Sequence, residues 1–399
     1  MVKPWDTATI GDFLDFKNGL NKGKEFFGYG TPIVNYTDVY KKRGLTKNDV
    51  RGKVNLTRDE IHRFDARKND VFFTRTSETP EEVGMSSVLL DDIDDCVFSG
   101  FVLRGRPKND MFTPEYCKYC FTTEAVRNAI TMGCTYTTRA LTNGKQLSAI
   151  EIVVPSKPEQ EAIAQSLTDI DELILSLEKL VAKTKAIKQG AMQELLTGKR
   201  RLPGFAGEWE KTVLGTVSSF YTGGTPSKKH EDWWNGDIPW ISSSDLTEDA
   251  ITSVNINRYI SKDAVEHSAT RICPKDAVLV VSRVGVGKVA VAPCELCTSQ
   301  DFTTIVPHRH NPHFLAYMLI PVMKELAMQA QGTSIKGVTV EDIQKIIMPT
   351  PTIDEQNQIV DILANMDSEI EALEQKLEKY SQVKQGMMQQ LLTGKIRLV

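Results

Sequence analysis

Two segments of the chain place apolar residues at the period of an amphipathic helix. In the first segment a 4-3-4-3-4 spacing joins Ile163, Leu167, Ile170, Ile174, Leu177 and Val181. In the second segment the same spacing joins Ile359, Leu363, Met366, Ile370, Leu373 and Leu377. This is the a/d stripe of a coiled coil, and charged residues such as Glu178 and Glu374 fall outside it. We therefore predict two helices of about 39 residues, each on the order of 55–60 Å long.

Both stripes are interrupted at the same place. Near Thr184 and Ile187, and again near Tyr380 and Val383, the next apolar residue comes early, as in a stammer. Two arrangements would bury the stripes: each helix could pack on its own globular region, or the two stripes could pack on each other. Their equal length, register and interruption favour the second arrangement, a coiled coil.

The two predicted helices belong to an internal repeat of the chain. With one offset of 196 residues, the repeated motifs are Glu159-Gln160 and Glu355-Gln356, Lys188-Gln189-Gly190 and Lys384-Gln385-Gly386, and Leu195-Leu196-Thr197-Gly198-Lys199 and Leu391-Leu392-Thr393-Gly394-Lys395. The regions before the helices match more faintly. Their counterparts are Trp5 and Trp209, Gly11 and Gly215, Phe16 and Phe220, and the segments Asn69 to Phe73 and Lys275 to Leu279, which align Asp70 with Asp276. Thr113-Pro114 and Asn311-Pro312 each predict a helix start.

The repeat predicts the domain plan. We expect an α/β (α+β) protein with two similar globular domains, residues 1–152 and 203–350, and two helical regions, residues 153–202 and 351–399. The first helix leads from one domain into the other, so the second must return if the stripes are to meet. The predicted coiled coil is therefore antiparallel, and a pseudo-twofold axis would relate the two halves.

The motifs at the ends of the two predicted helices resemble those of a known family. Pro155-x-x-x-Glu159-Gln160 and Pro351-x-x-x-Glu355-Gln356, with the Leu195 to Trp209 segment and the double repeat, are similar to the specificity subunit of type I restriction-modification systems. The resemblance implies two target recognition domains, each reading half of a bipartite site in double-stranded DNA, separated by a helical ruler. It implies two methyltransferase subunits and restriction subunits as partners, with S-adenosylmethionine bound in the methyltransferase subunits and no cofactor in this chain.

Composition is compatible with this interpretation but does not add to it. The 399 residues are 41% hydrophobic and 25% charged, and the net charge of −4 means that any DNA-binding field must be local. Seven scattered cysteines favour a reducing compartment. No apolar run approaches the ~20 residues of a membrane helix, and residues Met1 to Asp6 lack a signal-peptide core. We expect a cytoplasmic protein without membrane contact.

Motifs for catalysis or metal binding are incomplete. Asn311-Pro312-His313-Phe314 lacks the second proline of a methyltransferase motif, and Gly285-Val286-Gly287-Lys288 fails the phosphate-loop pattern at Ser282 and Val289, so a strand-to-strand turn is expected. Cys117-x-x-Cys120, on the helix that Pro114 begins, and Cys294-x-x-Cys297 do not correspond between the halves. We expect buried thiols, no metal site and no catalytic residues. His308, His310 and His313 are expected in a turn that is solvated or close to DNA.

Candidate DNA contacts lie where apolar strands give way to polar residues. Such residues can combine base reading with phosphate contacts. In the first half the candidates are Asn35, Tyr36, Lys41, Lys42, Arg43, Arg75, Ser77, Tyr136 and Arg139. In the second half they are Lys228, Lys229, Ser242, Ser243, Arg283, Thr333 and Lys336. The two sets agree in position but differ in side chain, as expected for readers of different half-sites. The alternative for these residues is that they lie in solvated loops. The alternatives for the whole chain are a methyltransferase fused to its specificity region and a scaffold that binds only proteins.

Overall fold

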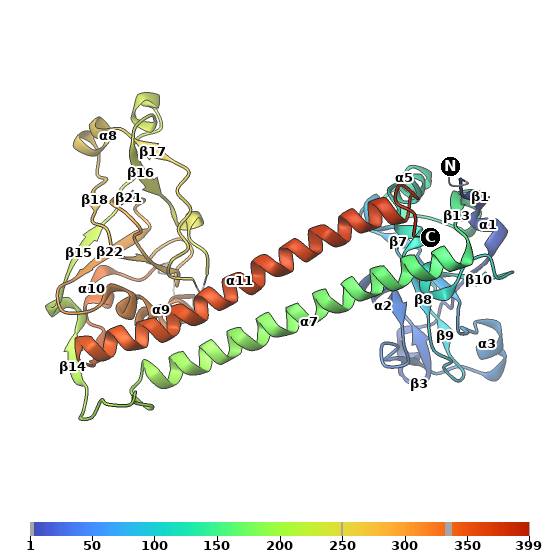
Figure 1. Cartoon of the computed structure of the whole chain (residues 1–399), viewed down its shortest axis with the longest axis horizontal. Coiled ribbons are helices and arrows are strands. Elements are labelled where there is room, and N and C mark those ends of the chain that lie inside the picture. Colours follow the sequence, from blue (N-terminus) through green and yellow to red (C-terminus); the bar gives the residue numbers. More distant parts are fainter. Residues whose placement is uncertain (1–3, 249, 332–336, 399) are drawn as a thin grey trace. The chain divides into compact units, whose positions relative to one another are not determined.

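The computed structural model describes residues 4–248, 250–331 and 337–398, and these fold into two compact units. Unit 1 comprises Met1–Glu178 and Lys376–Val399, and unit 2 comprises Lys179–Gln375. The two long helices, α7 (Lys157–Leu195) and α11 (Ile353–Leu391), have 39 residues each. Helix α7 begins in unit 1 and ends in unit 2, whereas α11 begins in unit 2 and ends in unit 1 (Figure 1).

Unit 1 is built on a sheet that is antiparallel except for one edge strand, which pairs parallel, and smaller sheets extend it. Its strands are β1 (Asp6–Thr9), β2 (Leu14–Asn18), β3 (Phe27–Val34), β4 (Gly44–Leu45), β5 (Gly52–Val54), β6 (Val71–Thr74), β7 (Thr76–Ser77), β8 (Ser86–Leu89), β9 (Val97–Phe98), β10 (Val102–Pro107), β11 (Thr135–Tyr136), β12 (Ala140–Leu141) and β13 (Glu151–Val154). The helices before α7 are α1 (Ile10–Phe13), α2 (Tyr36–Lys41), α3 (Arg58–Arg63), α4 (Pro114–Cys117), α5 (Glu124–Gly133) and α6 (Gly144–Ser148). The sheet orders are β2-β10-β6-β8-β4, β5-β3-β9, β11-β12-β7 and β1-β13. Strand β13 spans the boundary predicted between residues 152 and 153, because it pairs with β1.

Unit 2 repeats this plan. Its strands are β14 (Glu210–Val213), β15 (Ser218–Thr222), β16 (Ile238–Ile241), β17 (Tyr259–Ile260), β18 (Ile272–Cys273), β19 (Val278–Val281), β20 (Val289–Val291), β21 (Leu296–Thr298), β22 (Phe302–Pro307) and β23 (Ile347–Thr350). The helices before α11 are α8 (Lys262–His267), α9 (Pro312–Gln331) and α10 (Val340–Gln344). The orders β15-β22-β19-β20, β17-β16-β21-β18 and β14-β23 match three of the sheets of unit 1. The predicted α+β class and internal repeat are confirmed.

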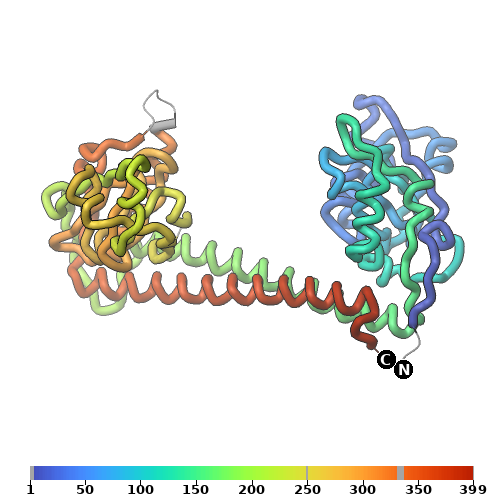
Figure 2. The backbone as a smooth tube through the Cα atoms, turned by 90° about the horizontal axis from the view of Figure 1, so that it is seen from above, coloured from blue at the N-terminus to red at the C-terminus, as the bar shows by residue number. Residues whose placement is uncertain are grey.

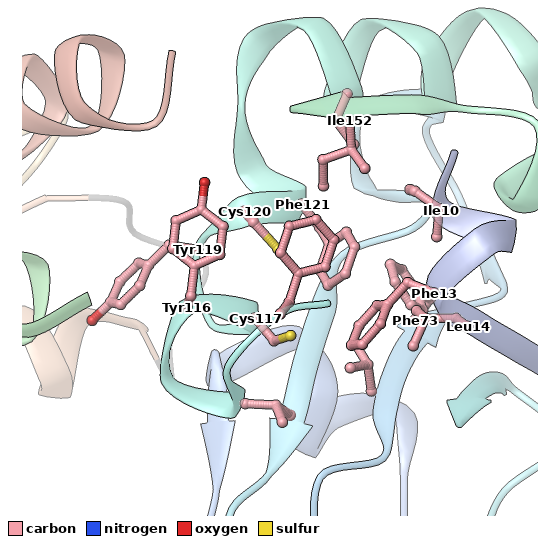
Figure 3. Packing of buried hydrophobic residues seen from close by; sticks show 14 of the residues in the cluster. Ile10, Phe13, Leu14, Phe73, Tyr116, Cys117, Tyr119, Cys120, Phe121 and Ile152 are labelled. Atoms are coloured by element: carbon pink, nitrogen blue, oxygen red, sulfur yellow. The ribbon is translucent and has the colours of Figure 1, made fainter. Parts of the chain in front are cut away.

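The central strand of each unit is buried on both faces. In β6, Val71 and Phe73 enter the core formed with the helices, whereas Phe72 enters a second core on the other face. In β19, Val278 and Val280 pack with α9, and the alternate residues enter a separate core. Figure 3 shows the helical core of unit 1, where the rings of Phe73 and Phe121 are 5.2 Å apart. This layering follows from the period of two along a strand.

The predicted alignment of the two halves is wrong by one residue just before the central strand. Asn69, with φ of 72°, and Asp276, with φ of 65°, hold the same left-handed turn before the central strand. The backbone N–H of Asn69 donates to the carbonyl of Leu89, as that of Asp276 does to Ala292. Asp276 therefore corresponds to Asn69 and not to Asp70. Sequence similarity was misleading here because Asp and Asn both tolerate a positive φ.

The two long helices pair antiparallel within each unit. In unit 2, Lys188 of α7 forms an ion pair with Asp367 of α11, and Lys185 pairs with Glu374 at 2.6 Å. In unit 1, Lys384 pairs with Asp171, which is the equivalent of Lys188–Asp367 after the offset of 196 residues. Because the residue number rises along one helix as it falls along the other, these pairs establish the predicted direction.

All twelve residues of the predicted stripe are buried or half-buried. Ile163 and Leu167 also join the core of unit 1, and Ile359 and Leu363 join that of unit 2. Each helix therefore begins by packing on its own globular part and then continues in the coiled coil. Both arrangements considered from the sequence are thus present, in different parts of the same helix.

The predicted stammer is wrong. Thr184 and Lys188 are buried, whereas Ile187 is 51% exposed and its counterpart Val383 is 41% exposed. The stripe thus keeps its heptad spacing by passing through polar residues. The physical reason is that Asp367 accepts both the ammonium of Lys188 and the hydroxyl of Tyr317 at 2.6 Å, as Asp171 accepts Lys384 and Tyr119. We call each trio, Asp367-Lys188-Tyr317 and Asp171-Lys384-Tyr119, a polar layer.

A buried carboxylate at the start of each long helix binds the end of the other. In unit 1, Glu159 accepts hydrogen bonds from Arg397 at 2.5 and 2.9 Å and from the indole of Trp5 at 3.1 Å. The hydrogen bonds from Arg397 lower the pKa of Glu159 to about 2. In Figure 2 the residues that follow α11 lie beside the beginning of the chain.

The same arrangement occurs in unit 2. Glu355 accepts from Arg201 at 2.8 Å through both oxygens and from the indole of Trp209 at 3.1 Å. We call the two groups, Glu159-Arg397-Trp5 and Glu355-Arg201-Trp209, the carboxylate clamps. Gly198 and Gly394, which end the long helices with positive φ, bring the backbone against these tryptophans; a Cβ at Gly394 would lie 3.1 Å from the Trp5 ring.

The glutamine of the Glu-Gln motif attaches the next helix of each unit. Gln160 accepts from the backbone N–H of Thr113 at 2.8 Å, and Gln356 accepts from that of Asn311 at 2.9 Å. Thr113 and Asn311 cap α4 and α9, so both predicted helix starts are confirmed. Helix α4 ends at Cys117, however, so Cys120 does not continue it as predicted.

No helix among the described residues is long and apolar enough to cross a membrane.

We predict that Asp367→Ala lowers the free energy of unfolding by about 3 kcal/mol. This is the low end of the range for breaking a buried ion pair, because the Asp367 side chain keeps 22% exposure. Chemical denaturation monitored by circular dichroism measures the change. Asp361→Ala, at an exposed position of the same helix, is the control and should be neutral. Equal stability of the two variants would show that the polar layer does not hold α11 in place.

Candidate nucleic-acid interface

In unit 1 the strand pairings gather several of the predicted contact residues. Strand β12 lies between β7 and β11, so Ser77 and Tyr136 flank the same short strand. Tyr36, Ser77 and Arg139 line one open depression of about 470 Å³, together with Tyr40 and Phe101. We call this depression the hollow. Tyr136 is 58% exposed and Phe101 57% exposed, so aromatic surface is available to a partner here.

A fixed carboxylate lies in the hollow. Glu82 accepts the hydroxyl of Ser77 at 2.7 Å and that of Tyr40 at 2.9 Å, one at each oxygen. The hydrogen bond from Ser77, followed by that from Tyr40, lowers the pKa of Glu82, and the bond to Glu82 raises the pKa of Tyr40. The rings of Tyr36 and Tyr40 stack with centroids 5.8 Å apart. The carboxylate is therefore ionised and oriented at neutral pH.

The other predicted residues of unit 1 have mixed environments. Asn35 caps α2, and its backbone N–H donates to Asp38 at 2.9 Å, so it has a structural task. Arg75 is half-buried and donates to the Gly100 carbonyl at 3.4 Å. Lys41 is exposed, and Lys42 is exposed but pairs with Asp49.

Arg43 is half-buried, unlike the exposed Lys41 and Lys42. Its guanidinium lies 5.8 Å from the centroid of the Tyr119 ring, and one nitrogen is 3.7 Å from the sulfur of Met388 in α11. The basic cluster predicted from sequence therefore divides into two exposed lysines and one arginine that packs near the end of α11.

In unit 2, Ser242 occupies the position of Asn35. Its backbone N–H donates to Asp245 at 2.7 Å, as that of Asn35 does to Asp38. The hydroxyl of Ser242 accepts from Arg258 at 2.7 Å, and Arg258 lies over the ring of Trp240 at 4.6 Å. Ser243 is half-buried, and its carbonyl accepts from Lys288 at 3.2 Å.

Arg283 is the exposed cation of the turn between β19 and β20. Val284 next to it is 70% exposed, and Gly285 and Gly287 adopt positive φ, which confirms a tight turn in place of a phosphate loop. Lys288 donates to backbone carbonyls, including that of Leu246 at 2.8 Å, so it fastens this turn. Lys228 and Lys229 are exposed in a separate loop. Thr333 and Lys336 lie outside the described residues.

Equivalent backbone contacts position the loops of the two units. The carbonyl of Arg75 accepts from the N–H of Thr142 at 3.0 Å, and that of Ser282 accepts from Val338 at 2.8 Å. Arg75 thus corresponds to Ser282, and the side chain differs although the backbone geometry is kept.

Sequence reasoning missed Tyr40, Glu82, Phe101 and Arg258. An acidic or aromatic side chain between strands carries no local signal of DNA contact. These residues come together only through pairing of strands that are distant in sequence.

The cysteines and histidines do not form a recognisable metal centre in the described part of the chain. All seven cysteines are free thiols, and Cys117, Cys120 and Cys297 are buried, whereas Cys294 is half-buried. His310 is buried and not solvated as predicted; it bonds Thr350 at 3.1 Å, and desolvation lowers its pKa. Asp263, Glu266 and His267 of α8 lie close together, but all three are exposed on a short surface helix.

The comparisons with known proteins agree with this architecture. The type I restriction modification DNA specificity domain matches residues 2–189 and 206–381. A putative type I restriction enzyme MjaX specificity subunit from Methanocaldococcus jannaschii is 23% identical and covers 99% of this chain and 94% of its own length. The EcoR124I/EcoR124II specificity subunit from Escherichia coli is 29% identical over 59% of this chain and 60% of its own length.

Solved structures share the fold. The S subunit of a type I restriction-modification system from M. genitalium has a TM-score of 0.60 and 14% identity, and the alignment covers 97% of this chain and 96% of that one. A structure described as the basis of complex assembly of the type I system also has a TM-score of 0.60, at 17% identity and 98% coverage of both chains. The duplicated sheets, the antiparallel helices and the two matching domains identify this chain as a DNA specificity subunit of the type I restriction-modification family.

Proposed function

We propose that each globular unit reads one half of a bipartite DNA site, while the coiled coil sets the gap between the halves. The observation that carries this proposal is the contrast within the repeat. The carboxylate clamps and polar layers use the same residue types in both copies, whereas the loops at Arg75 and Ser282 keep their backbone contacts and change their side chains. A scaffold that is repeated and loops that diverge are what two different half-sites require.

Methyl transfer and cleavage would then belong to partner subunits. We assign S-adenosylmethionine to the methyltransferase partners, with no catalytic group in this chain. Ile187 and Val383 support two copies of that partner, because they are exposed apolar residues at equivalent positions of α7 and α11. An apolar residue that the coiled coil leaves outside is a natural contact for another subunit. Restriction subunits would join the resulting assembly.

We predict that Arg283→Ala changes the methylated sequence in one half-site only. An arginine that reads guanine through O6 and N7 contributes about 1–3 kcal/mol of discrimination. Sequencing of methylated sites, in cells that express the chain with its partners, measures the effect. Arg75→Ala should alter the other half-site. Arg271→Ala, which removes the same charge from an exposed position of unit 2, is the control. An unchanged site in the Arg283→Ala map would remove Arg283 from the interface.

We predict that a heptad inserted after Glu178 in α7 and after Gln375 in α11 lengthens the gap between the half-sites. Seven residues add about 10.5 Å of helix, close to the length of three base pairs at about 3.4 Å each. The same methylation map reports the gap. Inserting the heptad in one helix only is the control: the apolar stripes could still pair, but the polar layers and carboxylate clamps of both units could not form together, so methylation should be lost. The original gap in the double insertion would contradict the ruler.

We predict that Ile187→Asp and Val383→Asp each remove one methyltransferase subunit, and that the double variant removes both. A carboxylate at the centre of an apolar contact is desolvated without compensation. Native mass spectrometry of the co-expressed complex gives the stoichiometry. Leu180→Asp is the control, because its 43% exposure is similar but its counterpart is Lys376 and not an apolar residue. Two bound subunits in the double variant would place the docking surface elsewhere.

A further inference from the structure

The loop that follows the central strand carries opposite charges in the two units. In unit 1, residues 75–85 contain Arg75 with Glu78, Glu81 and Glu82. In unit 2 the equivalent residues, 282–288, contain Arg283 and Lys288 and no acidic residue. The two loops start from equivalent strands, β6 and β19. A reader of DNA gains from cations near phosphates, so the acidic loop of unit 1 needs a separate explanation.

Glu82 is the acidic residue that the structure fixes in place. Its two oxygens each accept one hydroxyl, from Ser77 and Tyr40, at 2.7 and 2.9 Å. A carboxylate oxygen has a second acceptor site, so each oxygen can still receive a hydrogen bond. The side chain is half-buried, and among the described residues of unit 1 no lysine or arginine forms an ion pair with it. It is thus an oriented acceptor without a neutralising charge.

The residues that line the hollow around Glu82 have the chemistry to receive the edge of a base. The aromatic side chains of Tyr36, Tyr40 and Phe101 line it, with Arg139 exposed among its lining residues. Aromatic and apolar groups contact base edges and methyl groups, while an exposed arginine can hold a nearby phosphate. Glu78, the other acidic residue of the hollow, is exposed, so its side chain is not held as that of Glu82 is.

We propose that Glu82 is a specificity-determining residue of unit 1 and accepts a hydrogen bond from the exocyclic amino group of a cytosine or adenine in the major groove. This inference rests on the proposed function. A carboxylate repels the phosphates and the guanine acceptors O6 and N7, so it is compatible with a DNA interface where it receives a base N–H. Ser77 and Tyr40 are positioning residues, since they orient the carboxylate. Unit 1 would then select a base whose amino group lies in the major groove, cytosine or adenine, and Arg283 of unit 2 would select guanine.

The test deletes the amino group from DNA and the acceptor from the protein. The full chain, in complex with its methyltransferase partners, is bound to a duplex that carries the mapped site. Each cytosine of the half-site that Arg283→Ala leaves unchanged is replaced by 2-pyrimidinone, and each adenine by purine; both analogues lack the amino group. At one position we expect the wild-type affinity to fall about 5- to 150-fold, which corresponds to about 1–3 kcal/mol. In Glu82→Ala the same replacement should have no further effect.

Two variants make the test specific. Glu81→Gln is the matched control, because its exposed side chain does not line the hollow and only its backbone carbonyl is bound, by Arg127 at 2.7 Å. It should keep the wild-type response to the analogues. Tyr40→Phe retains the ring but removes the hydroxyl that orients Glu82, so it should reduce the response without abolishing binding.

The possible results separate the inference from the proposed function. If no cytosine or adenine of that half-site responds in the wild-type complex, or if the response persists in Glu82→Ala, the assignment of Glu82 is overturned. A response that disappears only in Glu78→Gln would also overturn it. If Glu82→Ala does not fold, Tyr40→Phe decides: a response as large as that of the wild type would overturn the assignment of Glu82. Failure of the unaltered complex to prefer its mapped duplex over a scrambled one would instead refute the proposed function.

Discussion

A buried carboxylate at the start of each long helix is the constraint on which the rest of the fold depends. Glu159 is 4% exposed and Glu355 is 1% exposed, and an ion in such a place is stable only when its partners are present. Those partners, Arg397 with Trp5 and Arg201 with Trp209, come from the end of the opposite helix and from the first strand region of the same unit. Each clamp therefore fixes the direction of both helices and attaches a globular part to them.

The polar layers add register to this direction. A stripe of leucine and isoleucine alone tolerates sliding by one heptad, because one apolar layer resembles the next. After such a slip Asp367 would face Val181 or Leu195 in place of Lys188, and its charge would be uncompensated. In the same way Asp171 would face Leu377 or Leu391 in place of Lys384. Tyr317 and Tyr119 donate to the same carboxylates and so connect the register of the helices to the globular core of each unit. The loops of the candidate interface extend from this core, so these hydrogen bonds help to position the loops relative to the helices.

The sequence alone revealed the features that depend on periodicity and repetition. The apolar spacing located both helices, and the Glu-Gln and Leu-Leu-Thr-Gly-Lys motifs revealed the duplicated plan. The outward position of Ile187 could not be predicted, since it depends on Lys188 meeting an aspartate 179 residues away. The hollow was missed for the same reason: Glu82 and Tyr40 are 42 residues apart and meet only when the sheets form. The predicted contact residues stay predictions, because local polarity indicates a loop but not what the loop touches.

The equality of the two carboxylate clamps has a consequence for how such proteins diversify. A globular part attaches to the helices through a tryptophan, a glutamate, an arginine and a glutamine that are the same in both copies. The attachment of a globular part to the helices is therefore the same in both copies, whereas the strands and loops farther from the clamp can differ. Genetic recombination within the repeated helix segments would exchange one globular part for another and keep the residues of the clamps. New pairs of globular parts would then arise in a single recombination event, and the long helices would stay the same.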